Sequence, residues 1–180
     1  MKKFFLILIS GIILCGCSFE EKDIYESYEH YSINSFDILS KEYYDDITGE
    51  IDTYVIAEIV PKNQTDSVLG LLYKISKDDY ILLDILSNGS IIDKTAVFST
   101  NRKLYTLGSN NVSGVYEYKL NGIKFEKHKL DLLFPENYFY YSIEIVDNEY
   151  LRFSGIIAGN NGATVDVLCS INNNICNFDW

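Results

Sequence analysis

The side chains that could carry catalysis are few. The chain has two histidines, His30 and His128, so a Ser-His-Asp or Cys-His arrangement would have to use one of them. No Gly-x-Ser-x-Gly sequence is present to supply a nucleophile at a sharp turn. His128 lies in Glu126-Lys127-His128-Lys129, whose charged neighbours predict a largely exposed strand. The sequence therefore predicts no catalytic residues, and we expect a protein that is not an enzyme.

Metal ligands are equally scarce. Neither a cluster of histidines and cysteines nor an Asp-x-Asp-x-Asp-Gly loop occurs, and the pairs Asp45-Asp46 and Asp78-Asp79 are typical of solvated turns. Two carboxylates for glycoside hydrolysis could come from distant parts of the chain, but the sequence singles out no pair. We therefore expect no metal site and no cofactor.

The first 17 residues have the three parts of a secretory signal. Lys2 and Lys3 form a positively charged start, residues 4–14 form an apolar core, and small residues follow. A membrane-spanning helix is the alternative, but it needs about 20 apolar residues, and Ser10 and Gly11 already interrupt this run. The segment is therefore predicted to direct export.

The end of this apolar core resembles the lipobox of bacterial lipoproteins. In Leu14-Cys15-Gly16-Cys17 an aliphatic, a tolerated and a small residue precede a cysteine. The resemblance covers residues 1–17 only. It implies a signal peptide over residues 1–16, a diacylglycerol thioether on Cys17 and an acylated amino terminus of the palmitate type. Stable membrane anchoring needs more than one acyl chain, which this arrangement would supply.

The same resemblance implies a location. A lipid on Cys17 would attach the protein to a membrane of the bacterial cell envelope. Ser18, the residue after Cys17, is similar to the residues that direct lipoproteins to the outer membrane. If the host has two membranes, the resemblance therefore implies an outer-membrane anchor with the protein facing the periplasm. The alternative is an ordinary cleaved signal whose cysteines are incidental. The polar run after Cys17 is expected to act as a lipidated tether over residues 17–30.

Cys169 and Cys176 are the remaining cysteines, and in an exported chain such a pair predicts a disulfide. A four-residue loop over 171–174 would place positions 169 and 176 opposite each other in a non-hydrogen-bonded pair, which suits a disulfide. A redox-active pair is the alternative. It is disfavoured because the spacing differs from the two-residue spacing of thiol oxidoreductases and no βαβ pattern surrounds it.

The mature chain would be strongly acidic. Loss of Lys2 and Lys3 with the signal lowers the formal net charge from −11 to −13. Nucleic acid and anionic lipid headgroups would be repelled by such a protein, because its basic residues are scattered along the sequence. A cationic protein partner fits better. The alternative interpretation is that the acidity only keeps an exported domain soluble.

Short strand patterns bounded by turn residues recur through the rest of the chain. A first strand is expected over 32–38, and further strands over 54–60, 68–75, 80–86, 91–98, 103–107, 115–120, 123–130, 140–146, 150–157 and 163–171. The strongest hairpin signal is Asn121-Gly122, because the residues on both sides of it alternate between apolar and polar. No helix period follows residue 50. The prediction is a single all-β domain over residues 31–180 with about ten short antiparallel strands.

The sequence is compatible with three arrangements of these strands. Hairpin patterns anchored at Ile75, Leu120 and Ile171 lie 45 and 51 residues apart, which is faintly similar to the repeat of propeller blades. Three such units are too few for a closed propeller, which has at least about four blades. A meander, a sandwich and an incomplete propeller-like arrangement therefore all fit.

The expected function is that of a non-enzymatic, membrane-anchored protein-binding module, such as an inhibitor or immunity-type protein. One candidate surface is Tyr138-Phe139-Tyr140-Tyr141, which fits either a core or an interface, since tyrosine is favoured at binding surfaces. A structural or assembly component of an envelope complex is the alternative. An envelope hydrolase is the third class, and it would need a deep cleft that holds two carboxylates or places His128 beside a nucleophile.

Overall fold

A computed structural model of the 180-residue chain describes residues 31–61, 65–88, 95–108, 114–158 and 162–179. The predicted signal peptide, Cys17 with its lipid, the tether and His30 lie outside the described residues. The expectations that concern them therefore remain predictions.

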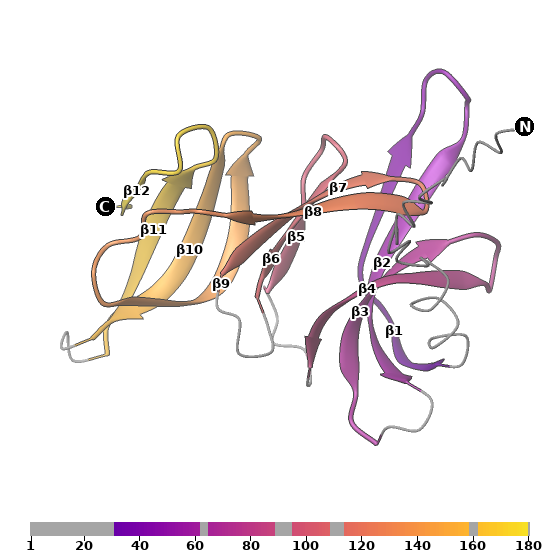
Figure 1. The fold of residues 1–180 in the computed structure, drawn as a ribbon, viewed down its shortest axis with the longest axis horizontal. Coiled ribbons are helices and arrows are strands. Elements are labelled where there is room, and N and C mark those ends of the chain that lie inside the picture. The colour runs from indigo at the N-terminus through magenta and orange to yellow at the C-terminus, as the bar shows by residue number, and fades with distance from the viewer. Residues whose placement is uncertain (1–30, 62–64, 89–94, 109–113, 159–161, 180) are drawn as a thin grey trace, which may run out of the picture.

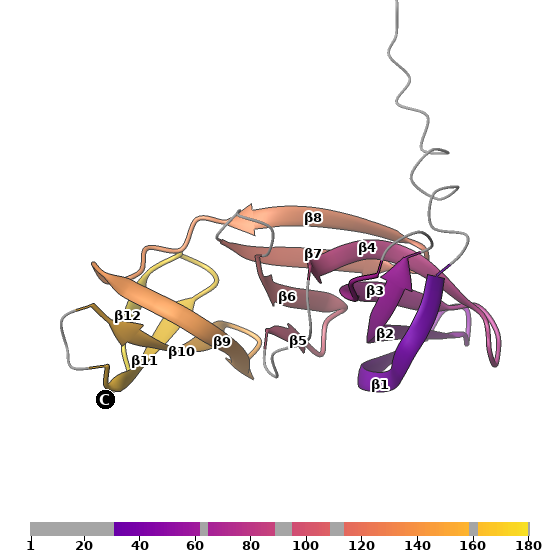
Figure 2. The same cartoon turned by 90° about the horizontal axis from the view of Figure 1, so that it is seen from below.

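The described residues form three four-stranded antiparallel sheets and no helix, so the all-β class is confirmed. The strands are β1 (Tyr31–Tyr44), β2 (Ile51–Pro61), β3 (Val68–Lys74), β4 (Tyr80–Asn88), β5 (Ala96–Phe98), β6 (Lys103–Leu107), β7 (Val115–Asn121), β8 (Lys124–Leu130), β9 (Tyr138–Asp147), β10 (Tyr150–Ile157), β11 (Thr164–Ser170) and β12 (Cys176–Phe178). In every sheet the strands follow one another in chain order, as a meander (Figure 1). The three sheets lie in a row in both views (Figure 2).

The twelve strands differ in detail from the predicted set. β1 is longer than expected because it stays paired with β2 through two irregularities in register, between Ile33 and Leu39. Of the strand expected over 91–98, β5 accounts for Ala96–Phe98, and residues 91–94 lie outside the described part of the chain. β12 was not among the separately expected strands, because three residues after a turn carry little periodicity, but the predicted hairpin already placed Cys176 opposite Cys169.

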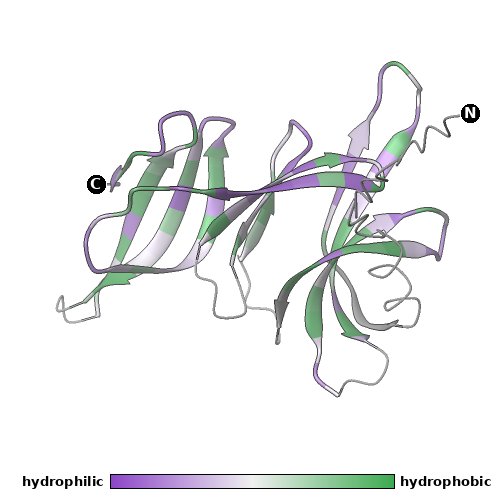
Figure 3. Cartoon of the chain, viewed as in Figure 1, coloured by the Kyte–Doolittle hydropathy of each residue, from purple (hydrophilic) through white to green (hydrophobic). Residues whose placement is uncertain are grey.

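The middle sheet, β5–β8, is covered on both faces. Leu104, Tyr118 and Leu120 pack in one apolar cluster with the first sheet, whereas Tyr105 and Val115 pack in a second cluster with the third sheet. Successive residues of a strand point to opposite faces, so β6 and β7 contribute to both clusters. Hydrophobic residues accordingly run along these strands, and hydrophilic residues mark the outer strand β8 (Figure 3).

Polar contacts reinforce the apolar packing between the first two sheets. Three tyrosine hydroxyls cross between them: Tyr43 donates to the Ser99 carbonyl (2.7 Å), Tyr54 to the Gly122 carbonyl (3.0 Å) and Tyr118 to Asp84 Oδ2 (2.7 Å). All three rings are buried. A buried hydroxyl without a partner would cost roughly 1–3 kcal/mol, so these bonds help fix how the two sheets meet.

The predicted 45- to 51-residue repeat corresponds to the sheets themselves. Ile75, Leu120 and Ile171 lie in or beside the turns β3–β4, β7–β8 and β11–β12, which join the third and fourth strands of each sheet. Among the described residues the three sheets form neither a closed ring nor a propeller. Of the three forms left open by the sequence, the structure is therefore a succession of meander sheets.

The hairpin predicted at Asn121-Gly122 is present, with its turn displaced by one residue. Asn121 pairs with Lys124, so the two-residue loop consists of Gly122 and Ile123. Gly122 has φ 59°, a left-handed conformation that glycine adopts without steric cost. Because of this shift Ile123 is exposed in the turn, and Phe125 is the residue of β8 that packs against Tyr118.

Candidate protein-binding surface

The most buried acidic group in the described structure is Glu117 on β7, with 6% of its surface exposed. Its Oε2 accepts hydrogen bonds from Lys103 Nζ at 2.8 Å and from the Tyr105 hydroxyl at 2.9 Å. Burial, and then the neighbouring Glu117 carboxylate, raise the pKa of Tyr105 above its usual range. The lysine and the hydroxyl both satisfy the carboxylate, so this cluster is an internal structural network.

His128 is exposed, as the sequence predicts. It lies opposite Glu117 in the β7–β8 register, and its Nε2 is 3.4 Å from Glu126 Oε2. No hydroxyl or thiol contacts the imidazole among the described residues. The one hydrogen-bond partner given by the geometry around His128, within the described residues, is thus the Glu126 carboxylate.

A shallow, open hollow lies between the β1–β2 hairpin and the turn that joins β5 to β6. Its walls include Tyr43 and Arg102, and the guanidinium of Arg102 pairs with Asp52 on β2. Burial raises the pKa of Tyr43 to about 12, and the positive charge of Arg102 partly opposes this shift. Arg102 thus already has an acidic partner within the protein, whereas Glu42 in the same wall forms no ion pair among the described residues.

In the described part of the chain, His, Cys, Asp and Glu side chains form no group of three or more that could hold a metal ion. Within the same residues, no helix has the length and apolar character that a membrane span requires.

The clearest candidate for contact with another molecule is the end of the β1–β2 hairpin. Tyr44 and Ile51 face each other as the last pair of the ladder and are 63% and 58% exposed. Ile47, in the turn between them, is 96% exposed. Exposed apolar side chains are common singly, but three together at one projecting hairpin form a local apolar patch. We call these three residues the hairpin tip.

The backbone around the hairpin tip is held by its own hydrogen bonds. Asp45 Oδ1 accepts the amide protons of Ile47 (2.8 Å) and Thr48 (3.0 Å), and these bonds lower the pKa of Asp45. The Asp45 amide donates to the Glu50 carbonyl (2.9 Å), and the Gly49 amide donates to the Asp45 carbonyl (2.8 Å). Gly49 has φ 73°, which a glycine tolerates. The turn therefore presents Ile47 in a defined conformation.

The hairpin also projects from its sheet. The ladder between β2 and β3 ends at the pair Tyr54–Tyr73, so the pairs of β1 with Ile51, Asp52 and Thr53 have no neighbour in β3. Figure 1 shows the hairpin reaching past the adjacent strands. Its inner face is braced by Tyr43 and Asp52 against the β5–β6 turn, which leaves the tip free on the outside.

The predicted aromatic cluster of residues 138–141 divides between core and surface. Tyr138 is buried and Tyr140 packs against Phe134, whereas Phe139 is 61% and Tyr141 47% exposed. The Tyr141 hydroxyl lies 3.2 Å from Thr164 Oγ1 across the outer face of the third sheet. Tyr138 and Tyr140 therefore belong to the core, as one interpretation predicts, whereas Phe139 and Tyr141 form a second exposed apolar area.

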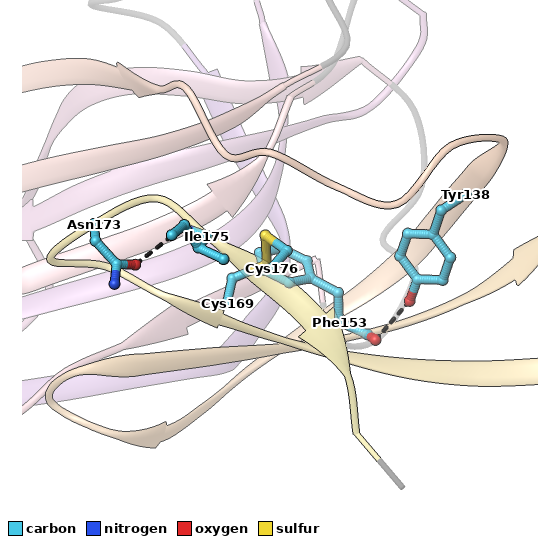
Figure 4. Close-up of a disulfide and its surroundings, with 6 residues drawn as sticks. All are labelled: Tyr138, Phe153, Cys169, Asn173, Ile175 and Cys176. Carbon is cyan, nitrogen blue, oxygen red and sulfur yellow. Dashed lines mark hydrogen bonds between the residues drawn. A yellow bond between two sulfur atoms is a disulfide. The ribbon is translucent and has the colours of Figure 1, made fainter.

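The disulfide joins Cys169 to Cys176, which are directly opposite in the β11–β12 ladder (Figure 4). Both cysteines are buried. The Ser170 amide donates to the Ile175 carbonyl at 2.9 Å, so the four-residue loop 171–174 and the predicted register are confirmed. The Asn173 side chain accepts the Ile175 amide proton and orders the turn.

Removing this disulfide is expected to destabilise the third sheet. Closing so short a loop contributes roughly 2–3 kcal/mol in the chain-entropy model, so a C169A/C176A variant should lose about that much free energy of unfolding. Urea unfolding followed by circular dichroism measures it. Wild type under reducing conditions is the matched comparison and should behave like the variant. Equal stability of oxidised protein and variant would contradict the prediction.

The hairpin tip is the part of the candidate surface that sequence reasoning missed. Ile47 stands between Asp46 and Thr48-Gly49, in a segment otherwise typical of a solvated turn. An isoleucine in such a turn is the one available signal. Its exposure depends on the register of Tyr44 with Ile51, which the sequence does not specify.

No family model matches this chain, and neither a curated protein nor a solved structure is significantly similar to it.

Proposed function

We propose that the protein is a lipoprotein of the bacterial cell envelope, anchored through lipid on Cys17, whose β region binds another protein without catalysing a reaction. Inhibitor and immunity-type proteins likewise act by binding another protein and not by catalysis. If the host has two membranes, the anchor lies in the outer membrane and the β region faces the periplasm.

One observation carries the binding role: large apolar side chains are exposed in groups, while the least exposed acidic side chains are paired internally. The hairpin tip and the pair Phe139 and Tyr141 leave apolar surface in water. In contrast, Glu117, Asp52 and Asp84 each pair with a basic side chain of the same protein. Exposed apolar groups with aromatic members are the usual features of protein interfaces.

An assembly role in an envelope complex is the second candidate, and the edge of β8 favours it. β8 is the outer strand of the middle sheet, and no described strand pairs with its free side. Strand edges can bind extended segments of partner proteins. Lys124, Lys127 and Lys129 are exposed on this strand, however, and lysines commonly protect edge strands from such pairing.

Lipidation at Cys17 predicts that the C17S and C15S variants differ in their partition into detergent. Full-length wild type should enter the detergent phase on Triton X-114 partition, whereas C17S should remain in the aqueous phase because it lacks the acyl chains. C15S is the matched control and should behave like wild type. Detergent partition of C17S equal to that of wild type would contradict lipidation at Cys17.

The binding role is tested by isolating the tagged, full-length lipoprotein from its own host in mild detergent after cross-linking. A defined partner at one-to-one stoichiometry is the expected result. Recovery in a large stoichiometric assembly would favour the second candidate instead. Isolation of the lipoprotein alone, in low and in high salt, would contradict the proposal.

A further inference from the structure

We infer that the hairpin tip is the part of the surface that enters the partner, and that the partner is a protein with an apolar pocket rimmed by lysine or arginine. Ile47 would fill the pocket, and Tyr44 and Ile51 would contact its wall. This inference rests on the proposed binding function and assigns it a site and a class of partner.

The exposure of Ile47 is the first argument. With 96% of its surface in water, this side chain contributes almost nothing to the folded chain alone. Burial of an isoleucine in an apolar pocket contributes about 1.5–3 kcal/mol. Tyr44 and Ile51 add two half-exposed side chains on one face of the ladder, since residues directly opposite in a strand pair project to the same side. The tip can therefore bury three side chains at once.

The ordered turn is the second argument. Binding a flexible loop costs conformational entropy, whereas a loop already held in its bound form avoids much of this cost. The Asp45 carboxylate and the two backbone bonds across the turn hold Ile47 outward before any partner arrives. The brace between Asp52 and Arg102 fixes the base of the hairpin to the middle sheet.

The charge around the tip identifies the rim of the pocket. Glu42, Asp46 and Glu50 lie within five residues of Ile47, and all three are exposed. None of the three forms an ion pair among the described residues. Three exposed carboxylates close in sequence to the exposed Ile47 complement a pocket edged by basic groups, and they would speed association with such a protein. The same carboxylates would be repelled by anionic lipids and so oppose insertion of Ile47 into such a membrane. The site that receives Ile47 is therefore a pocket in a protein.

The test places a photoreactive amino acid at position 47 of the full-length lipoprotein in its own host. Control positions are 78, in the exposed acidic turn between β3 and β4, and 139, in the other apolar area. The inference expects a protein adduct from position 47 and none from position 78. Mapping should place the adduct in an apolar site of the captured protein with lysine or arginine beside it. Adducts to phospholipid from position 47 would overturn the inference.

Affinity for the captured, purified protein then tests the chemistry. I47E should weaken binding at least about 30-fold, the size of an interface hot spot, whereas I47L should stay within about threefold of wild type. D46N/E50Q should slow association about tenfold at low salt and reduce its salt dependence. Because Ile47 is exposed, all these variants should keep the wild-type urea midpoint. Wild-type affinity of I47E would overturn the inference.

The two proposals fail in different ways. A partner captured only from position 139 would overturn the hairpin tip as the site and leave the binding function standing. Capture of no protein from any of the three positions, together with isolation of the lipoprotein alone, would overturn both.

Discussion

The protein is expected to unfold cooperatively as the pH rises from 10 to 12. Five buried tyrosines have pKa values raised above the ordinary value of 10, and burial is the largest cause in each: Tyr43, Tyr54, Tyr105, Tyr118 and Tyr138. For Tyr43 the pKa is raised to about 12. Negative charge adds to the shift at Tyr105 and Tyr118, because their hydroxyls donate to Glu117 and Asp84.

The direction of the effect follows from proton binding. Unfolded tyrosines lose their protons near pH 10, whereas the folded protein retains them to higher pH. The contribution to stability is therefore complete below pH 10 and is lost as the pH rises toward the folded pKa values. Each buried tyrosine lowers the free energy of unfolding by about 1.4 kcal/mol per pH unit above pH 10, so five together lower it by about 7 kcal/mol by pH 11. That is comparable to the whole free energy of unfolding of an ordinary domain, about 5–15 kcal/mol.

Circular dichroism and the ultraviolet absorbance of tyrosinate, recorded on the same samples, measure this transition. Loss of structure and formation of buried tyrosinate should coincide. Y105F should reduce the slope of unfolding free energy against pH by about 1.4 kcal/mol per pH unit above pH 10, because one linked proton is removed. Full ionisation of the tyrosines with the circular dichroism unchanged would contradict the prediction.

Gly155→Ala is expected to lower the free energy of unfolding by about 3 kcal/mol, near the upper end of overpacking effects. A Cβ at this position would lie 2.6 Å from Tyr138 Cζ and closer still to the Phe139 carbonyl oxygen. The Tyr138 ring passes beside Gly155 so that its hydroxyl can donate to the carbonyls of Phe153 (2.6 Å) and Val165 (3.0 Å). Backbone on one side and a fixed ring on the other leave the methyl group no room.

Gly70→Ala is the matched control. Its Cβ would meet the ends of the flexible Leu82 and Ile59 side chains, at 2.9 and 3.0 Å, so rotamer changes should limit the loss to about 1 kcal/mol. Urea unfolding of both variants measures the difference. In a Y138L background the cost of Gly155→Ala should fall by about 1 kcal/mol, since the ring is gone. Equal losses for the two glycine variants would contradict the prediction, and an unchanged cost in the Y138L background would show that the Tyr138 ring does not contribute to it.

The elements that could be predicted from the sequence are those fixed by neighbouring residues. The strand register of the disulfide hairpin was correctly predicted because Cys169 and Cys176 are seven residues apart around an asparagine-rich turn. The repeat anchored at Ile75, Leu120 and Ile171 was visible because each sheet is a local meander. Short-range patterns thus determine the strands and the period of the fold.

The features that depend on packing between sheets could not be predicted in the same way. Alternation along β7 predicts that Glu117 faces water, yet this residue is buried because the middle sheet is covered on both faces. The hairpin tip depends on where β3 stops pairing with β2, which is a tertiary property. A single strand pattern contains no information on how many layers lie against it.

The chain-order meander of the three sheets has a consequence for the kinetics of folding. Every strand pairs with a neighbour in sequence, so the ladders have low contact order for an all-β protein, and each sheet can begin to form once its own segment of chain is available. The middle sheet, however, buries its two faces against sheets that come before and after it. We therefore expect its consolidation to await the last sheet, so that folding is completed only when the sheet that contains the disulfide has formed.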